Sequence, residues 1–189
     1  MSITVEGINV RIKEVSKDFK VKFKDLTEAG QKRLFKENKD IFFFDALTSK
    51  YKSVRTLALI KKDNCSSVSL NKAIKLLEKE KRATNVNLII ELLNIPNLDL
   101  DDSLRKSLAH SDYWELRLWI ANDKNTPLQI LKEMLWSATK IFIGYDSSTE
   151  MDAIITNPNF ELDEEVEQII KRFNPTAVSK IESRIKELT

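Results

Sequence analysis

The sequence is poor in the residue types that disulfides, metal centres and phosphate loops require. It contains one Cys, one His and three Gly among 189 residues. A single cysteine, Cys65, can form no intramolecular disulfide, and a zinc site with several Cys and His ligands is excluded by count. Gly7, Gly30 and Gly144 stand too far apart for a Gly-rich phosphate loop. We therefore expect no metal and no cofactor.

Long apolar runs are also missing from the chain. No stretch of about 18 or more apolar residues occurs, so no membrane span and no membrane partner are expected. The first residues, MSITVEGINV, lack the basic segment and the apolar segment of a secretion signal. Because disulfides are also excluded, the cytoplasm is the expected location.

Few residues suggest catalysis. No local signature brings Cys65 and His110 together as a nucleophilic pair. His110 stands at an expected helix end, and Cys65 stands in an expected turn. The acidic groups at residues 99–102 and 163–167 precede expected helices, where carboxylates cap free amide groups and complement the helix dipole. The sequence predicts no catalytic residue.

The chain does contain an uneven distribution of charge. Its overall composition, 42% hydrophobic and 32% charged, is that of a folded globular protein. Residues 1–82 carry 20 Lys and Arg against 11 Asp and Glu, a net charge of +9, whereas residues 83–189 have a net charge of −7. A basic half could face nucleic acid or an acidic protein, and the split could favour head-to-tail contacts between copies. Ordinary solvated helix surfaces would explain it equally well.

The first quarter of the chain has a strand-like pattern. Residues 9–15 and 19–24, NVRIKEV and FKVKFK, flank a polar turn, and apolar residues alternate with Lys in the second segment. This period of two predicts a β-hairpin, with ITV as a possible extra strand. The lysines on one face could contact phosphate or keep an edge strand soluble. Asp25 and Glu28 then have the spacing of a capping box for a short helix.

From about residue 40 the apolar period becomes helical. Leu70, Ala73, Ile74 and Leu77 fall at i, i+3, i+4 and i+7 and predict one buried stripe. The opposite side of this helix is basic. Its cations are Lys72, Lys75, Lys79 and Arg82.

Two segments of the chain repeat each other at an offset of 62 residues. The segments are ALTSKYKSVRTLALIKKDN and LAHSDYWELRLWIANDKN. The matched pairs are Ser49 with Ser111, Tyr51 with Tyr113, Val54 with Leu116, and Arg55 with Arg117. Four asparagines, each followed by a polar cap and an apolar helix, mark the turns at Asn64, Asn97, Asn125 and Asn159. The sequence thus predicts about four units of roughly thirty residues, each with two short helices.

The residues of the repeat suit its construction. Asn tolerates the left-handed conformation that ends a helix, and the turn prolines cannot donate the bond that would continue one. Thr126 can cap the next helix and Pro127 can open it. Arg55 and Arg117 are placed to bridge to carboxylates or to helix-end carbonyls of a neighbouring unit. Short helix pairs cannot bury their apolar faces alone, so we expect the units to stack.

These units resemble the HEAT-like repeat superfamily, and particularly its bacterial variant leucine-rich repeats. Members read approximately as L-A-x-D-x-x-x-x-V-R-x-x-V-A-x-N-P-N-T-P-x-x-x-L-x-x-L. The third unit carries the pattern at Leu108, Ala109, Leu116, Arg117, Ile120, Ala121, Asn122, Asn125, Thr126, Pro127, Leu131 and Leu135. The fourth carries it at Met151, Ile155, Asn157, Pro158, Asn159 and Leu162, with Asp152 in place of the arginine, and the second has Asn87 there.

The resemblance covers about residues 45–173. It implies an α-solenoid, and such repeats mostly serve as interaction scaffolds. The iron–sulfur cluster that some variant-repeat proteins carry on a separate Cys-rich segment is excluded by the single cysteine.

The aromatic residues are the candidates for a partner surface. Tyr113 and Trp114 stand at a helix start, where they could anchor a partner or stack on bases, whereas Trp119 is expected in the core. The segment LWSATKIFIGYDSS lengthens the third unit, and insertions in solenoids often bind on one face. The expected partner-binding residues are Tyr113, Trp114, Trp136, Phe142 and Tyr145.

The sequence therefore predicts a mainly α protein, an α-solenoid of about four HEAT-like repeats with an N-terminal β-hairpin cap. Residues 1–39 would form the hairpin and a short helix, and residues 40–189 the repeats with a C-terminal capping helix. The expected function is a non-enzymatic, cytoplasmic module that binds another, unidentified protein. Homo-oligomers are possible as well.

Two alternatives remain open at this point. The first is a nucleic-acid-binding HEAT-like solenoid that uses Lys20, Lys22, Lys24, Lys72, Lys75, Lys79 and Arg82. The second is a HEAT-like DNA glycosylase, a class that excises alkylated bases with aromatic residues and an aspartate in a basic groove. Asp112, Trp114 and Trp119 supply similar ingredients. That family's motif does not match residue by residue, and the acidic second half would repel a phosphate backbone.

Overall fold

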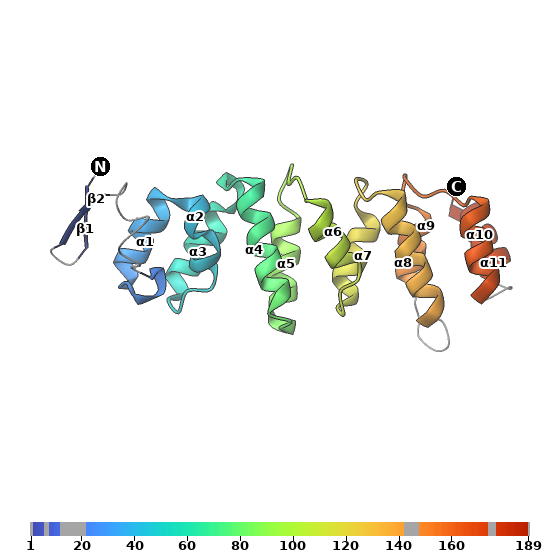
Figure 1. The fold of residues 1–189 in the computed structure, drawn as a ribbon, viewed down its shortest axis with the longest axis horizontal. Helices are drawn as coiled ribbons and strands as arrows, with labels where there is room; N and C mark the ends of the chain where they lie inside the picture. Colours follow the sequence, from blue (N-terminus) through green and yellow to red (C-terminus); the bar gives the residue numbers. More distant parts are fainter. Residues whose placement is uncertain (1, 6–7, 12–21, 142–147, 174–176, 189) are drawn as a thin grey trace. The chain divides into compact units, whose positions relative to one another are not determined.

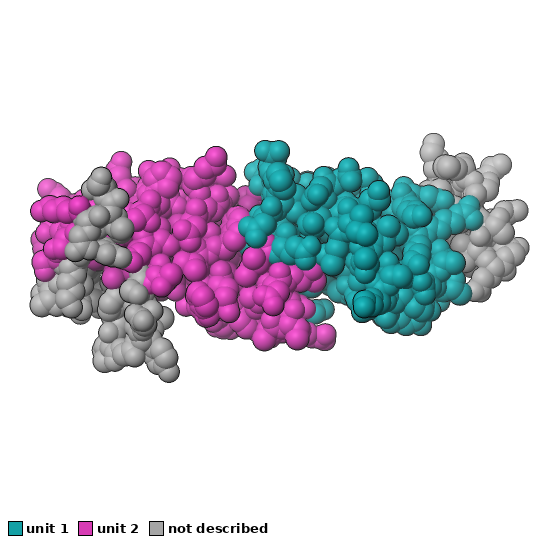
Figure 2. All heavy atoms as spheres, turned by 180° about the vertical axis from the view of Figure 1, so that it is seen from behind, with its two compact units in different colours: residues 1–80, 91–99 teal, residues 81–90, 100–189 magenta. Residues whose placement is uncertain are grey.

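The computed structural model describes residues 2–5, 8–11, 22–141, 148–173 and 177–188 (Figure 1). This part of the chain contains eleven α-helices, two short 3-10 helices and one two-stranded sheet. The prediction of a mainly α protein is confirmed. The helices form two compact units, coloured separately in Figure 2. Unit 1 comprises residues 1–80 and 91–99, and unit 2 comprises residues 81–90 and 100–189.

The helices of unit 1 are α1 (Glu28–Glu37), α2 (Lys39–Leu47), α3 (Lys52–Lys61) and α4 (Ser67–Lys79). Unit 1 also holds the strands β1 (Ser2–Val5) and β2 (Ile8–Arg11) and the 3-10 helices η1 (Phe23–Asp25) and η2 (Lys62–Asn64). The helix α5 (Ala83–Leu93) begins in unit 2 and ends in unit 1. The helices of unit 2 are α6 (Asp102–Ala109), α7 (Trp114–Asn122), α8 (Leu128–Ile141), α9 (Ser148–Ile155), α10 (Glu164–Phe173) and α11 (Ala177–Leu188). The boundary predicted between residues 39 and 40 falls inside unit 1, at the start of α2.

The core of unit 1 joins the apolar stripes of its helices. Phe35 of α1 lies against Phe43 of α2, with ring centroids 6.5 Å apart. The stripe predicted on α4 is confirmed, because all four of its members are buried. Helix α2 packs on both α1 and α3, and α1 also contacts α3 while α2 contacts α4. Helices α1 and α2 therefore each contact the second helix along as well as the next.

Unit 2 has the same alternation of contacts over more helices. Helix α8 contacts both α6 and α10, and helix α9 contacts both α7 and α11. Its core residues include Leu104, Leu108, Leu116, Ile120, Leu131 and Ile154, which are fully buried. Within this unit the even-numbered helices thus form one row of neighbours and the odd-numbered helices another.

The hydrogen bonds of the two arginines match the alignment at an offset of 62 residues. Arg55 donates from Nη1 to the carbonyl of Ser49 at 2.6 Å, and Arg117 donates from Nη1 to the carbonyl of Ser111 at 2.8 Å. Arg117 also donates to the carboxylate of Glu150 on α9. Its Nε lies 3.0 and 3.2 Å from the two carboxylate oxygens, and its Nη2 lies 3.0 Å from Oε2. The predicted bridge to a neighbouring repeat is confirmed for Arg117, which reaches Glu150 on α9, whereas Arg55 bonds only the turn that precedes its own helix.

The serines and tyrosines of the same segments also occupy equivalent positions. The backbone N–H of Tyr51 donates to the hydroxyl of Ser49 at 3.1 Å, and that of Tyr113 donates to the hydroxyl of Ser111 at 3.3 Å. Both serines are buried, and both tyrosines directly precede a helix. Each unit therefore contains one copy of the same Ser-x-Tyr turn with an arginine folded back onto it.

The N-terminal region differs from its prediction. β1 pairs antiparallel with β2, with Ser2 opposite Arg11 and Val5 opposite Ile8. The strand predicted at residues 19–24 is wrong over its described end, because Phe23–Asp25 form η1. Phe23 is buried there, and its ring stacks on Phe42 at 5.3 Å.

Two predictions about helix caps are wrong. Thr27, not Asp25, caps α1, because its hydroxyl accepts from the N–H of Gly30 at 3.3 Å. Thr126 bonds the preceding helix: its hydroxyl donates to the carbonyl of Ile120 at 2.7 Å instead of capping α8.

Of the four turn asparagines only Asn97 has a left-handed backbone, with φ 60°. The turn asparagines therefore do not share one backbone role.

Asparagines of the last described turn act through their side chains. The amide of Asn157 donates to the carbonyls of Ala121 and Asp123 at 2.8 and 3.0 Å. The amide of Asn159 donates to the carbonyls of Lys124 and Thr126 at 2.7 and 3.0 Å. These bonds tie the turn after α9 to backbone carbonyls between α7 and α8, about 35 residues earlier in the chain.

Candidate functional site

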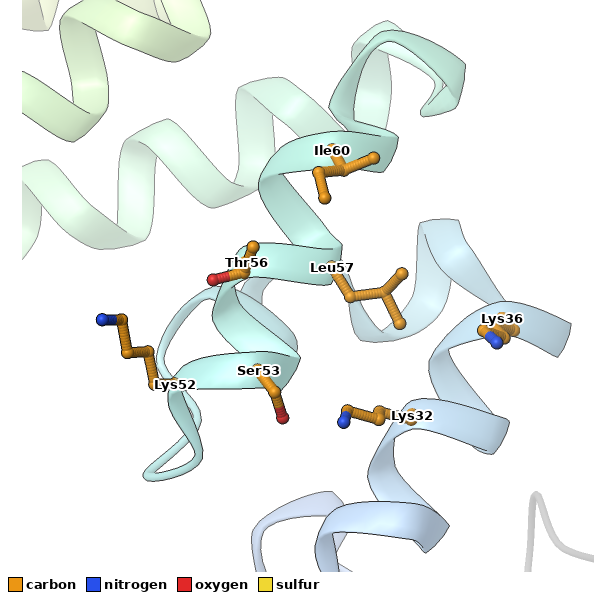
Figure 3. Close-up of a pocket in the computed structure, with 7 residues that line it drawn as sticks. All are labelled: Lys32, Lys36, Lys52, Ser53, Thr56, Leu57 and Ile60. Atoms are coloured by element: carbon orange, nitrogen blue, oxygen red, sulfur yellow. The ribbon is translucent and has the colours of Figure 1, made fainter.

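A groove in unit 1 runs between α1 and α3 (Figure 3). It is open to solvent and has a volume of about 620 Å³. Lys32 and Lys36, one turn apart, line it from α1. Helix α3 completes the lining with residues from three successive turns, chiefly Lys52, Ser53, Leu57 and Ile60. The groove therefore has a basic rim and an apolar part.

A small polar network joins the starts of the two helices. Glu28 of α1 accepts from the ammonium of Lys32 at 2.7 Å and from the hydroxyl of Ser53 on α3. The hydrogen bond from Lys32, with that from Ser53, lowers the pKa of Glu28 below its usual value. The carboxylate is thus ionised at neutral pH and holds one of the groove lysines.

The other two groove lysines are not paired in this way. Among the described residues, neither Lys36 nor Lys52 has a carboxylate within ion-pair distance. Figure 3 shows Lys32 facing Ser53, while Lys52 extends away from α1. Ile60 has 66% of its surface exposed, and Leu57 is half-buried beside it. The groove is therefore a net positive surface next to uncovered apolar groups.

The packing below the groove is dense. Phe35 on α1 and Val54 and Ala58 on α3 have no exposed surface. Gln31 is also fully buried, and its side chain accepts from the hydroxyl of Ser49 at 2.5 Å and donates to the carbonyl of Leu26 at 3.2 Å. The positions of α1 and α3 are therefore fixed by contacts that no ligand needs to form.

The aromatic residues predicted to bind a partner include a well-exposed tryptophan. Trp114 at the start of α7 has 54% of its surface exposed. Its neighbour Tyr113 is half-buried, and the Tyr113 hydroxyl donates to the carbonyl of Lys81 at 2.9 Å. Lys81 itself has a left-handed backbone, φ 48°, and its ammonium lies 3.2 Å from the carboxylate of Asp112. These contacts fix the turn beside the indole.

The remaining aromatic candidates have different environments. Trp136 on α8 is 41% exposed. Trp119, expected in the core, is half-buried. Phe142 and Tyr145 lie outside the described residues. The structure thus places two of the five predicted partner residues, Trp114 and Trp136, at the surface, and Tyr113 partly so.

The basic residues predicted for nucleic acid lie on separate elements. Lys72, Lys75 and Lys79 are all exposed along one side of α4. Lys72 is close enough to Asp45 to oppose the effect of burial, which raises the pKa of that carboxyl. Lys22, Lys24 and Arg82 are also exposed, and Lys20 lies outside the described residues.

The residues weighed for catalysis have structural contacts. Cys65 is half-buried, and burial together with the nearby charge of Asp40 raises the pKa of its thiol to about 11. His110 ends α6, with Nδ1 2.9 Å from the carbonyl of Lys106. Cys65 is therefore protonated at neutral pH and is a poor nucleophile in this environment.

The acidic groups cap helices, as predicted. Asp101 accepts from the N–H of Leu104 at 2.7 Å, and Asp163 accepts from the N–H of Val166 at 2.9 Å. Lys132 donates to Asp163 at 2.7 Å, which lowers the pKa of Asp163. Within the described ranges, no group of three or more His, Cys, Asp or Glu could hold a metal ion.

Sequence reasoning did not identify the groove. Its lysines look like ordinary solvated helix faces, and only the contact between α1 and α3 brings them together. A weak signal was present, because Lys32 and Lys36 stand one turn apart on the first helix after the basic N-terminal segment.

Comparisons with protein-family models, with curated proteins and with solved structures gave no match. Across the part of the chain that the structure describes, no helix has both the length and the apolar character needed to cross a bilayer.

Proposed function

We propose that this chain is a non-enzymatic helical-repeat module that binds another protein. The observation that carries the proposal is the repeated turn, in which an arginine bonds the carbonyl of a serine six residues earlier in both units. A turn that recurs at an offset of 62 residues is expected where HEAT-like repeats stack. In this proposal about four such repeats form an α-solenoid, and β1 and β2 cap its N-terminal end.

The pattern of helix contacts supports the repeat. A stack of helix pairs requires each helix to pack on its counterpart in the next pair, which is the second helix along the chain. This contact occurs for α1 with α3 and α2 with α4 in unit 1, and four times in succession in unit 2. Arg117 adds a polar contact of the same kind, because it joins α7 to α9 through Glu150.

Trp114 is the favoured contact residue for the partner. Tryptophan is enriched among the residues that contribute most to protein interfaces, because its large rigid surface loses little conformational freedom on binding. Here the indole is more than half exposed, while Tyr113 and Lys81 hold the adjacent turn through a 2.9 Å hydrogen bond. An exposed aromatic on a rigid base is what a binding surface needs.

The proposal is tested by affinity purification from the native cell with the full chain as bait. We expect one or more proteins to be retained after nuclease treatment and to be lost with Trp114→Ala, while far-UV circular dichroism stays unchanged. Val68→Ala is the matched control, since Val68 is an exposed apolar residue of unit 1. If Trp114→Ala lowers the helical content, the indole is structural and this surface assignment is wrong.

A second candidate function, nucleic-acid binding, is favoured by the row of Lys72, Lys75 and Lys79 on α4, all of which are exposed. Binding through such a row would weaken steeply with salt, because phosphate contacts release counterions. It would also fall when the three lysines are reversed to Glu. A fluorescence anisotropy titration with labelled oligonucleotides at low and high salt tests this candidate. Failure to bind at low salt removes it.

A further inference from the structure

We propose that the groove between α1 and α3 binds an acidic, amphipathic segment of a partner protein. The inference rests on the proposed function and adds the chemistry of the partner. It concerns unit 1 alone and does not involve Trp114. The occupant would place carboxylates on the lysine rim and an apolar side chain against Leu57 and Ile60.

Charge complementarity selects an acidic occupant. Three lysines line the groove, and Glu28 is within ion-pair distance of only one of them, Lys32. Among the described residues Lys36 and Lys52 therefore lack a carboxylate partner. Isolated surface lysines need none, but Lys36 on α1 and Lys52 on α3 add two unpaired cations to the lining beside Lys32, and together they give a local positive potential that attracts anions.

The apolar part of the groove selects a protein segment over a bare anion. Ile60 is among the most exposed large apolar residues of the described chain, and it lies in the groove one turn beyond Leu57. Covering these side chains would remove apolar surface from water, which an inorganic ion or a polyacidic chain cannot do. A helix with a Leu or Phe one turn from an Asp or Glu would meet both parts at once.

The lining of the groove disfavours nucleic acid. Proteins that bind single strands combine cations with aromatic side chains on which bases stack. The groove is lined by lysines, hydroxyls and aliphatic residues, with no aromatic or arginine among them. A phosphate backbone would meet the lysines but would leave Ile60 uncovered.

The groove is also preformed. Phe35 of α1 and Val54 and Ala58 of α3 are fully buried, and Glu28 joins the starts of both helices through its bonds from Lys32 and Ser53. A peptide would therefore bind without first ordering the helices, which lowers the entropic cost of binding.

The test measures fluorescence anisotropy of labelled peptides with the full-length chain. Each peptide has about twelve residues, roughly 18 Å as a helix, which exceeds the length of the groove helices in contact. The first carries Glu with Leu at i, i+3, i+4 and i+7. The second replaces Leu by Ala, the third replaces Glu by Lys, and the fourth probe is oligothymidine. We expect the first to bind most tightly, with affinity that falls as salt rises.

Two variants locate the binding. The double variant Lys36→Glu with Lys52→Glu should lower the affinity for the first peptide by about tenfold or more. Lys50→Glu with Lys124→Glu is the matched control, because it makes the same charge change at exposed lysines that do not line the groove, and it should leave peptide binding within about twofold. Ile60→Ala should reduce the preference for the Leu peptide over the Ala peptide.

Several results would overturn the inference. The first is equal binding of the first peptide to both double variants, or no binding to the wild-type chain. The second is tighter binding of oligothymidine that the Lys36/Lys52 variant abolishes. The third is concentration-dependent self-association, seen by sedimentation, that the same variant removes, which would make a second copy the occupant. A partner still lost with Trp114→Ala would then leave the proposed function standing.

Discussion

The ion pair between Arg117 and Glu150 allows a sharp test of the contact between α7 and α9. The guanidinium donates three bonds to the carboxylate and one to the carbonyl of Ser111. Arg55 makes the equivalent carbonyl bond in unit 1, but among the described residues it has no carboxylate partner. Arg117→Ala removes the carboxylate pair and the carbonyl bond, whereas Arg55→Ala removes only a carbonyl bond. The two variants therefore form a matched pair.

The geometry sets the expected loss of stability. The side chains of Arg117 and Glu150 are 22% and 14% exposed, between a surface pair and a buried one. A hydrogen bond from a charged donor to a partly buried carbonyl contributes about 1 kcal/mol to the free energy of unfolding, once its partial exposure to solvent is included. Breaking the bidentate pair leaves a half-buried carboxylate unpaired, at a cost of about 2 kcal/mol. We expect Arg117→Ala to lower the free energy of unfolding by about 3 kcal/mol, and Arg55→Ala by about 1 kcal/mol.

Urea unfolding provides the assay. All three tryptophans of the chain, Trp114, Trp119 and Trp136, lie in unit 2, so tryptophan fluorescence follows the unit that contains Arg117. Far-UV circular dichroism follows both units and serves for Arg55→Ala. In a thermal scan, a loss of about 3 kcal/mol should lower the Tm by roughly 6–12 °C.

A double-mutant cycle isolates the pair itself. Glu150→Ala, Arg117→Ala and the double variant should give a coupling energy of about 2 kcal/mol, since each single change leaves the other group without its partner. A coupling below about 0.5 kcal/mol, or equal losses for Arg117→Ala and Arg55→Ala, would refute the reasoning. It would mean that the carboxylate is solvated rather than held between the helices.

Three further predictions concern single groups. The Cys65 thiol, with its pKa raised to about 11, should react slowly with iodoacetamide at pH 7, and its rate should rise until the pH approaches 11; a fast reaction at pH 7 would contradict its burial. The backbone N–H of Ser66 lowers the pKa of Asp40, so this carboxylate stabilises the fold above its unfolded pKa and the contribution is lost as the pH falls through the lower folded value. Asp40→Asn should therefore destabilise the chain at pH 7 in urea unfolding, and the difference from wild type should shrink below about pH 4. Thr126→Val removes a buried 2.7 Å bond to the end of α7 and should cost about 1 kcal/mol, whereas Thr156→Val, at an exposed threonine, should cost less; equal losses would mean that the buried hydroxyl contributes little.

Features that depend on spacing within one helix could be predicted from the sequence. The stripe of Leu70, Ala73, Ile74 and Leu77 is buried because helical periodicity alone places these residues on one side. The alignment of the two segments correctly pairs Arg55 with Arg117, because each arginine lies six residues after its serine and bonds that carbonyl. In both cases the deciding distances are local.

Features that depend on competition between nearby groups could not be predicted. Asp25 had a plausible capping-box spacing, but η1 holds it away from the first turn of α1, and Thr27 caps that helix instead. Thr126 could cap the helix that follows it or bond the helix that precedes it. Its side chain is fully buried and donates to the Ile120 carbonyl of the preceding helix. Sequence gives the candidates in such cases, and packing decides among them.

The candidate surfaces show why function was harder to read than fold. Tyr113 and Trp114 are adjacent in the sequence and both aromatic, yet one hydroxyl is used to hold Lys81 while the indole stays exposed. Lys32 and Lys52 are twenty residues apart and unremarkable singly, yet they line one groove. A binding surface is set by which groups tertiary contacts leave unpaired. Lys36 and Ile60, which the fold leaves without a carboxylate or an apolar cover among the described residues, are therefore better guides to a partner than any motif in this chain.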